Sequence, residues 1–157
     1  MTKTHQYKTY TVWTDNNGNS TKSYKSYSRN HVILADSKPD ILASADPAFR
    51  GDPSRYNPEE MLVAATSSCH MLWYLHFCAV NGVQVLSYAD TAEGAMTEGE
   101  GNGGYFTAIT LRPAITISAD SDIEIAMKLH KDAAKECFIA NSLKCPVTHA
   151  PIIKKAE

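Results

Sequence analysis

Residues 57–81 carry the sequence NPEEMLVAATSSCHMLWYLHFCAVN, and this stretch decides the fold of the chain. Asn57 is a residue type that caps helix N-termini, and Pro58 suits the first helical position. Glu60 stands where a capping box needs its glutamate. The stretch therefore predicts a helix that begins directly after Asn57 and ends near Asn81.

No Asp, Glu, Lys or Arg occurs between Met61 and Val80. A helix of about 20 uncharged residues has the length of a membrane span, but the polar residues 66–70 would then lie at the centre of the bilayer. The composition favours instead a central helix in a globular protein. Such a helix is expected to be covered over most of its circumference by a sheet or by a partner chain.

The length and charge of the chain exclude several classes of protein. A chain of 157 residues is expected to form one domain, residues 1–157. A net charge of −2 provides no basic face, so nucleic acid is not an expected partner. The first 13 residues lack an apolar run of signal-peptide length, which indicates a cytoplasmic protein. In that compartment the four cysteines are buried small side chains or working thiols, because structural disulfides are rare there.

The rest of the chain predicts an α+β fold with antiparallel sheets. Strands are expected at His5–Thr14, Thr21–Ser28 and His31–Ala35, from Val83 towards Met96, from Tyr105 to Ser118 with a break at Pro113, and at Cys145–Lys154. A turn is expected at residues 15–19, a structured loop at residues 36–56, and a glycine-rich hairpin at residues 99–104. The first three strands would form an antiparallel meander.

A second helix is predicted from about Asp122 to Phe138. Ser121 and Glu124 have the spacing of a capping box and would open it. Its expected apolar stripe consists of Ile125, Ala126, Leu129, Ala133 and Cys137.

The four cysteines differ in their surroundings. Nine residues separate Cys69 from Cys78, which places them on opposite sides of a helix and about 13 Å apart along its axis. Cys78 lies between apolar neighbours and is expected in the core, as is Cys137, which stays a fallback partner for a reactive thiol. Cys69 follows small polar residues, so spacing alone leaves its reactivity open. Cys145 precedes a proline, which favours an extended and accessible segment.

A metal site is not expected. Neither the C-x-x-C nor the H-E-x-x-H spacing of common zinc sites is present in the chain.

Two motifs resemble the OsmC/Ohr family of thiol peroxidases. Asn57-Pro58-Glu59 is followed by Cys69 on the central helix, and Cys145-Pro146-Val147 stands near the carboxyl terminus. The order of the expected elements is similar to that of the family over nearly the whole chain. Phe49-Arg50-Gly51-Asp52 and Cys69-His70 are similar to the OsmC-like branch. The resemblance implies an α+β fold with antiparallel sheets around a long central buried helix in an intertwined homodimer.

The activity that the resemblance implies is reduction of organic hydroperoxides, an antioxidant oxidoreductase function in oxidative stress. Cys69 would attack the distal peroxide oxygen and become a sulfenic acid, and Cys145 would condense with it to a disulfide. The family suggests a dithiol reductant such as a lipoylated protein, and no cofactor.

The resemblance also implies an arginine that stabilises the reactive thiolate. In the best-understood relatives it lies in a glycine-rich N-terminal segment, but residues 16–21 contain none. Arg50, Arg55 and Arg29 are the candidates, and Arg50 is favoured because Gly51 allows close backbone approach just before the helix. Glu59 would orient that arginine by a bidentate pair.

Helix geometry predicts that the site is shared between subunits. Glu59 and Cys69 are separated by about 15 Å of axial rise and about 80° of rotation on one helix. Two antiparallel copies that cross near residue 64 would bring Glu59 of one chain beside Cys69 of the other. The alternative is an arginine on a long loop that joins the two groups within one subunit.

Two rival functions stay open from the sequence. The first is a binding module that holds a lipid-like ligand in an apolar groove, with Cys69 merely buried. The second is a Cys/His hydrolase or transferase that uses His149 or His70 as its base.

Overall fold

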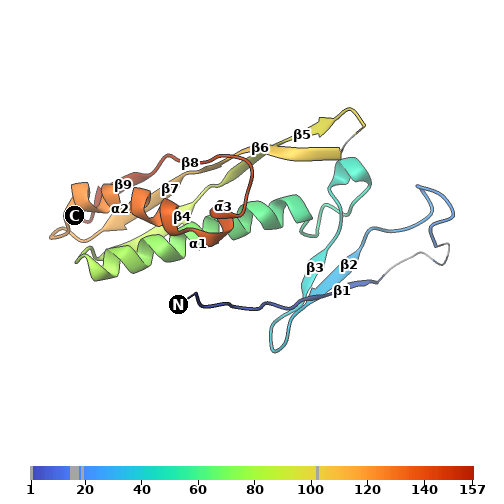
Figure 1. The fold of residues 1–157 in the computed structure, drawn as a ribbon, viewed down its shortest axis with the longest axis horizontal. Coiled ribbons are helices and arrows are strands. Elements are labelled where there is room, and N and C mark those ends of the chain that lie inside the picture. The colour runs from blue at the N-terminus through green and yellow to red at the C-terminus, as the bar shows by residue number, and fades with distance from the viewer. Residues whose placement is uncertain (1, 15–17, 19, 102) are drawn as a thin grey trace. The chain divides into compact units, whose positions relative to one another are not determined.

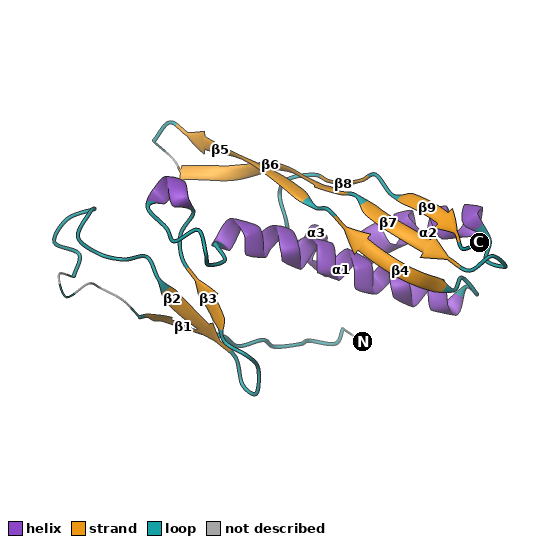
Figure 2. Ribbon diagram, turned by 180° about the vertical axis from the view of Figure 1, so that it is seen from behind, coloured by secondary structure: helices purple, strands orange, loops and turns teal. Residues whose placement is uncertain are grey.

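The computed structural model describes residues 2–14, 18, 20–101 and 103–157. The chain forms two compact units, Met1–Met61 and Leu62–Glu157. Each unit is described separately here, and Figure 1 and Figure 2 show the elements of both.

The first unit contains an antiparallel meander, although one of its three strands differs from those that the sequence predicts. Its strands are β1 (Tyr10–Trp13), β2 (His31–Leu34) and β3 (Ile41–Ala43), in the order β1-β2-β3. Val12 pairs with Val32, which pairs in turn with Leu42. The strand β3 lies inside the segment that was expected to be a loop, and a short 3-10 helix, η1 (Pro47–Phe49), follows it.

The predicted strand at residues 21–28 is wrong, because this segment consists of turns and bends. Its carbonyl groups are used by nearby side chains instead of by a neighbouring strand. The Arg29 guanidinium donates hydrogen bonds to the Tyr27 and Tyr24 carbonyl oxygens at 2.5 and 2.6 Å. The Ser26 hydroxyl lies 2.9 Å from the Ser23 carbonyl oxygen. Local side-chain bonds of this kind compete with sheet ladders. Of the predicted turn at residues 15–19, all but Gly18 lie outside the described residues.

The long helix α1 spans Pro58–Val80 and confirms the central prediction. Its start is a capping box: the Glu60 backbone N–H donates to Asn57 Oδ1 at 2.8 Å, and the Asn57 N–H donates to Glu60 Oε2 at 3.2 Å. These bonds satisfy backbone donors that a helix start otherwise leaves unpaired.

The second unit contains two three-stranded sheets. Its strands are β4 (Val85–Asp90), β5 (Glu93–Gly99), β6 (Gly103–Leu111), β7 (Pro113–Ile117), β8 (Val147–His149) and β9 (Ile152–Lys155). The sheet orders are β4-β7-β9 and β5-β6-β8. The expected purely antiparallel sheets are corrected, because β8 and β9 pair in parallel with β6 and β7. A helical crossover before β8 makes this direction possible.

That crossover contains α2 (Ile123–Glu136) and the short α3 (Phe138–Asn141). The cap of α2 is Asp122 and not Ser121: Asp122 Oδ1 accepts the backbone N–H groups of residues 124 and 125. Ser121 is buried and its hydroxyl accepts the Gln84 N–H at 2.9 Å. Ile125 belongs to the predicted apolar stripe but is 41% exposed. His130, which the prediction left out, is buried on the same side of α2 as Ala126 and Ala133.

The core of the second unit lies between α1, α2 and the sheet β4-β7-β9, all of which are labelled in Figure 2. One stripe of α1 is buried there, formed by Thr66, His70, Tyr74 and Cys78. Residues on another side of the helix are exposed, namely Ala64, Ala65, Ser68, Leu72 and Ala79. The rest of the second unit therefore covers only part of the helix circumference. Among the described residues, no helix is long and apolar enough to cross a membrane.

Candidate functional site

Two thiols from distant parts of the sequence meet beside α1. Cys69 lies half-buried near the middle of α1, and Cys137 lies 1% exposed directly after α2. The pKa of the Cys137 thiol is raised to about 11, chiefly by burial and to a smaller extent by the hydrogen bond of this thiol with Cys69. Backbone N–H groups at the start of α3 act in the opposite direction. Cys137 is therefore a protonated thiol at neutral pH, and it is placed to donate its S–H to the Cys69 sulfur.

A ring contact supports the same placement independently. Trp73 follows Cys69 by one helical turn, and Phe138 follows Cys137 directly. The Trp73 and Phe138 rings meet edge to face, with centroids 5.5 Å apart. The segment at 137–138 therefore runs along the face of α1 that carries Cys69. Phe138 is 65% exposed and leaves an apolar surface beside the thiols.

The other two cysteines behave differently. Cys78 is 1% exposed in the core, as the sequence predicts. Cys145 is half-buried between α3 and β8. Within the described part of the chain, no hydrogen bond or electrostatic contact joins Cys145 to Cys69. The structure thus places Cys137 beside Cys69, and the role predicted for Cys145 stays a prediction.

The three candidate arginines all belong to the first unit. Arg29 is held by the carbonyl groups of residues 24 and 27, and its guanidinium lies 4.0 Å from the Tyr27 ring centroid. Arg55 forms an ion pair with Asp52, with 3.7 Å between Nε and Oδ2, and donates to the His31 carbonyl oxygen. Arg50 is exposed, and its side chain has no hydrogen bond or ion pair within the described residues. Its guanidinium is therefore free to bind another group.

The backbone at Arg50 and Gly51 is tightly constrained. Arg50 has a left-handed conformation with φ of 66°, and its N–H donates to the Pro47 carbonyl oxygen. A Cβ at Gly51 would lie 1.6 Å from the Ala45 carbonyl oxygen, so only glycine fits this turn. The approach that Gly51 allows is thus to its own loop.

Glu59 lies in the first turn of α1. Its Oε2 atom is buried and has no hydrogen-bond partner among the described residues. A buried carboxylate oxygen in this state favours a cationic partner, because an unpaired buried charge is costly.

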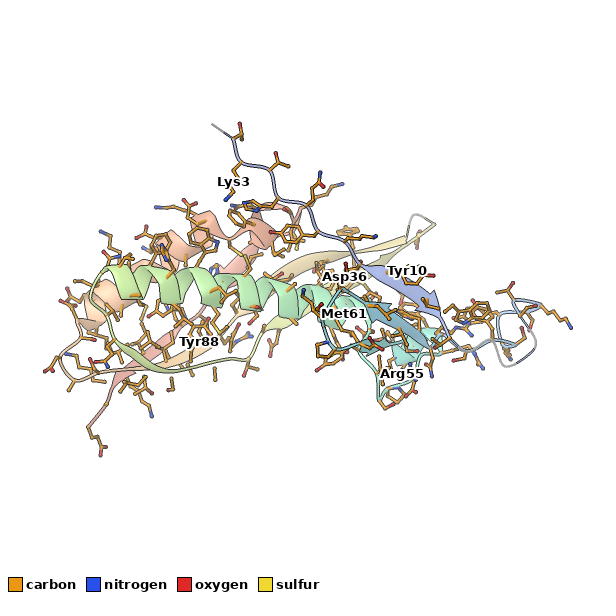
Figure 3. The ribbon with its side chains drawn as sticks, turned by 90° about the horizontal axis from the view of Figure 1, so that it is seen from below. Lys3, Tyr10, Asp36, Arg55, Met61 and Tyr88 are labelled. Atoms are coloured by element: carbon orange, nitrogen blue, oxygen red, sulfur yellow. The ribbon has the colours of Figure 1, made fainter. Side chains whose placement is uncertain are left out.

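Behind the thiols, the second unit holds a stack of buried aromatic side chains. His70 on α1 is joined to His130 on α2 by a hydrogen bond of 3.0 Å between Nε2 and Nδ1. Tyr74 stacks on His130 with ring centroids 3.9 Å apart, and His149 on β8 lies 4.2 Å from His70. Tyr88, labelled in Figure 3, faces Tyr74 from β4. From the sequence, His70 and His149 were predicted only as possible bases of the alternative Cys/His hydrolase or transferase. The sequence analysis did not identify His130.

Burial makes these imidazoles neutral. The pKa of His70 is lowered to about 3 and that of His130 to about 4, chiefly by burial and to a smaller extent by nearby histidines. Burial also lowers the pKa of His149, against the opposing effect of Asp90. Asp90 itself is fixed by the Ser67 hydroxyl at 2.5 Å and by the Arg112 backbone N–H at 2.7 Å. His70 bonds another histidine rather than a thiol, which disfavours the Cys/His hydrolase.

Within the described ranges, no group of three or more histidine, cysteine or acidic side chains has an arrangement that could hold a metal ion.

Comparison with known proteins places this chain in a family. The family model for OsmC-like proteins matches residues 51–151. The chain therefore belongs to the OsmC-like protein family. No curated protein matches the chain.

Several solved structures have the same fold. An OsmC-like protein of unknown function from Vibrio cholerae is 32% identical, with a TM-score of 0.83 over 95% of this chain and 100% of that chain. An organic hydroperoxide resistance protein OsmC from Legionella pneumophila is 16% identical, with a TM-score of 0.67 over 96% of this chain and 99% of its own. An organic hydroperoxide resistance protein from Elizabethkingia anophelis is 17% identical, with a TM-score of 0.66 over 97% and 99%. The predicted α+β fold of the OsmC-like kind is thereby confirmed, while the intertwined homodimer stays a prediction.

Proposed function

We propose that the protein is a thiol-dependent peroxidase that reduces organic hydroperoxides through Cys69. The observation that carries the proposal is the half-buried Cys69 thiol in contact with the protonated, buried Cys137 thiol. Family membership supports it, because structural neighbours are named organic hydroperoxide resistance proteins. A cytoplasmic location fits four free thiols and stays a prediction.

The chemistry needs one nucleophile and one condensing thiol. The Cys69 thiolate attacks the distal oxygen of the hydroperoxide, the O–O bond breaks, and the alkoxide leaves as an alcohol after it takes a proton. The sulfenic acid on Cys69 then reacts with a second thiol, which forms a disulfide and releases water. A dithiol reductant takes up the disulfide and returns both cysteines to thiols.

The substrate is an organic hydroperoxide rather than hydrogen peroxide. Two exposed apolar side chains lie near Cys69. Leu72, 61% exposed, follows Cys69 by three residues on α1. Phe138, 65% exposed, contacts Trp73, which follows Cys69 by one helical turn. Apolar surface of this kind favours a bulky apolar group over a small polar peroxide.

Replacement of Cys69 tests the function directly. With cumene hydroperoxide and a dithiol reductant, Cys69→Ser is expected to lower the rate of peroxide consumption roughly a thousandfold or more, because a hydroxyl cannot replace the thiolate. Cys78→Ser removes a thiol in the core and is the matched control, expected to keep most of the activity. Equal rates for wild type and Cys69→Ser would instead support the apolar binding module.

The second thiol is a separate question. The sequence predicts Cys145, whereas the contact between the Cys69 and Cys137 thiols favours Cys137. We expect peroxide-treated protein to contain a Cys69–Cys137 disulfide, because the Cys137 thiol interacts with the Cys69 thiol and the adjacent Trp73 and Phe138 rings are in contact. Peptide mapping by mass spectrometry checks this result. A Cys69–Cys145 peptide would restore the pairing predicted from the sequence, and it would require the segment before β8 to move.

We propose that Arg50 stabilises the Cys69 thiolate and that Glu59 orients the Arg50 guanidinium. Arg29 and Arg55 are engaged in their own unit, while Arg50 is free there. Arg50→Ala is expected to slow alkylation of Cys69 at pH 7 about tenfold, because a guanidinium favours the charged thiolate. Arg55→Ala is the matched control and is expected to change the rate little. Equal alkylation rates in wild type and Arg50→Ala would reject this role.

We further propose that the protein works as a homodimer that packs through α1. The exposed side of this helix bears small and apolar residues, among them Ala64, Ala65 and Leu72. Small side chains allow two helices to approach closely, and a two-fold axis there would generate two equivalent sites.

A further inference from the structure

The hydrogen bond between His70 and His130 connects the two helices that carry or precede the thiols. His70 lies on α1, and His130 lies on α2. Both imidazoles are buried, at 0% and 3% exposure, and their nitrogens are 3.0 Å apart. This bond is a directional contact between helices in an otherwise largely apolar core.

Each thiol is connected to this bond through one of the two helices. Cys69 directly precedes His70 on α1. Cys137 follows His130 by seven residues, about two helical turns, at the end of α2. The Trp73 and Phe138 rings then make the adjacent contact between α1 and the segment after α2. A change in the register of α2 against α1 would therefore move Cys137 relative to Cys69.

We propose that His70 and His130 are positioning residues that hold the register of α2 on α1 and so keep the Cys69 and Cys137 thiols in contact. The inference deepens the proposed function, since it concerns the same thiol pair. Neither histidine reacts with the substrate.

The physical reason is the cost of breaking the bond inside the core. The remaining ring nitrogens, His70 Nδ1 and His130 Nε2, are buried with no hydrogen-bond partner among the described residues. Among the described residues, each ring therefore makes a single hydrogen bond, the one between His70 Nε2 and His130 Nδ1. If α2 shifted, both rings would lose it and remain buried, which is strongly disfavoured. Apolar contacts are less directional and select a register less sharply.

The neighbours of the pair keep both rings in place and leave them neutral. Tyr74 stacks on His130, and His149 packs against His70. Tyr88 lies behind Tyr74 on β4, and the carboxylate of Asp90 lies within electrostatic range of His149 and Tyr88. The Asp90 carboxylate accepts a hydrogen bond from the Ser67 hydroxyl on α1, which fixes its position.

The closeness of the two thiols can be measured without any peroxide. Reduced protein is equilibrated with glutathione and glutathione disulfide, so that the two protein thiols lose two electrons and two protons while the glutathione disulfide becomes two thiols. The equilibrium constant gives the effective concentration of one thiol at the other. Alkylation and peptide mapping report the Cys69–Cys137 disulfide specifically.

Two variants of His130 separate hydrogen bonding from shape. His130→Asn keeps a polar group at the position of Nδ1, while His130→Leu has nearly the same branched shape without it. We expect His130→Leu to lower the effective concentration about tenfold, and His130→Asn to stay within about threefold of wild type. Circular dichroism checks that each variant is folded. If a His130 variant is unfolded, His70→Gln and His70→Met make the same comparison, because glutamine places its amide at the position of Nε2.

Equal constants for the polar and apolar variants would overturn the proposal, and so would a wild type that forms no Cys69–Cys137 disulfide under these conditions. The outcome is separable from the proposed function. A protein that shows the expected constants but does not consume cumene hydroperoxide keeps the positioning pair and loses the peroxidase.

Discussion

Mixing Cys69→Ser subunits with Glu59→Gln subunits is expected to restore hydroperoxide consumption that neither variant shows alone. Glu59 and Cys69 both lie on α1, ten residues apart, so helix geometry separates them by about 15 Å and about 80° within one chain. If two copies of α1 cross near residue 64, Glu59 of one chain serves Cys69 of its partner. The mixed dimer then has one intact site and one site that lacks both groups.

The size of the recovery follows from the symmetry. Random exchange of equal amounts makes half of the dimers mixed, and each has one of its two sites intact, so about a quarter of wild-type activity is expected. The unpaired, buried Oε2 of Glu59 fits a partner from another chain. Glu60→Gln is the matched control, because glutamine still completes the capping box and activity should persist. If mixing restores nothing, each subunit is self-contained and an arginine must join the groups within one chain.

The urea midpoint of the reduced protein is expected to fall steeply as the pH drops from 6.5 to about 4. Burial lowers the pKa of His70 to about 3 and of His130 to about 4, from an ordinary value of 6.5. Between these values the unfolded chain binds protons that the folded chain does not, so the free energy of unfolding decreases with decreasing pH. The stabilisation is complete above 6.5. Each unit by which the pKa of a histidine differs between the folded and the unfolded state corresponds to about 1.4 kcal/mol. The free energy of unfolding is therefore expected to decrease by several kcal/mol between pH 6.5 and about 4.

Substitution of the two histidines tests whether they cause this pH dependence of stability. The double variant His70→Gln/His130→Asn is expected to reduce the pH dependence in this window to less than about half, since His149 still titrates. The Asp52 carboxyl, whose pKa is lowered by hydrogen bonds from Ser54, loses its contribution only below 3.8. An unchanged slope in the double variant would show that the histidines are not the source.

Local sequence signals predicted the elements whose stabilising bonds are themselves local. The capping residues Asn57 and Glu60 and the charge-free run after them specified α1 to within one residue, because the cap bonds form between residues three apart. The break at Pro113 was also predicted, since proline lacks the N–H that a continuous strand needs. The segment 21–28 failed because side chains of Arg29 and Ser26 take its carbonyl groups.

The candidate site was predicted only in part. Cys69 could be singled out because it follows Asn57-Pro58-Glu59 as in the OsmC/Ohr family, whereas its small polar neighbours alone left its reactivity open. The buried His130 was missed, although it follows Leu129 in the buried stripe of α2, because a histidine in such a stripe is normally counted as polar and exposed. The Cys137 thiol was assigned to the core, which is correct, but burial did not indicate which group it touches.

The sequence by itself determined the family, the long helix α1 and the thiol at its centre, because motifs, caps and hydrophobic patterns act over a few residues. Tertiary structure alone decided which thiol meets Cys69 and which imidazole meets His70. Cys137 and His130 lie 68 and 60 residues further along the chain, and their positions depend on how α2 packs against α1 and the sheet. Contacts at such separations follow from the packing of whole elements, so no local pattern encodes them.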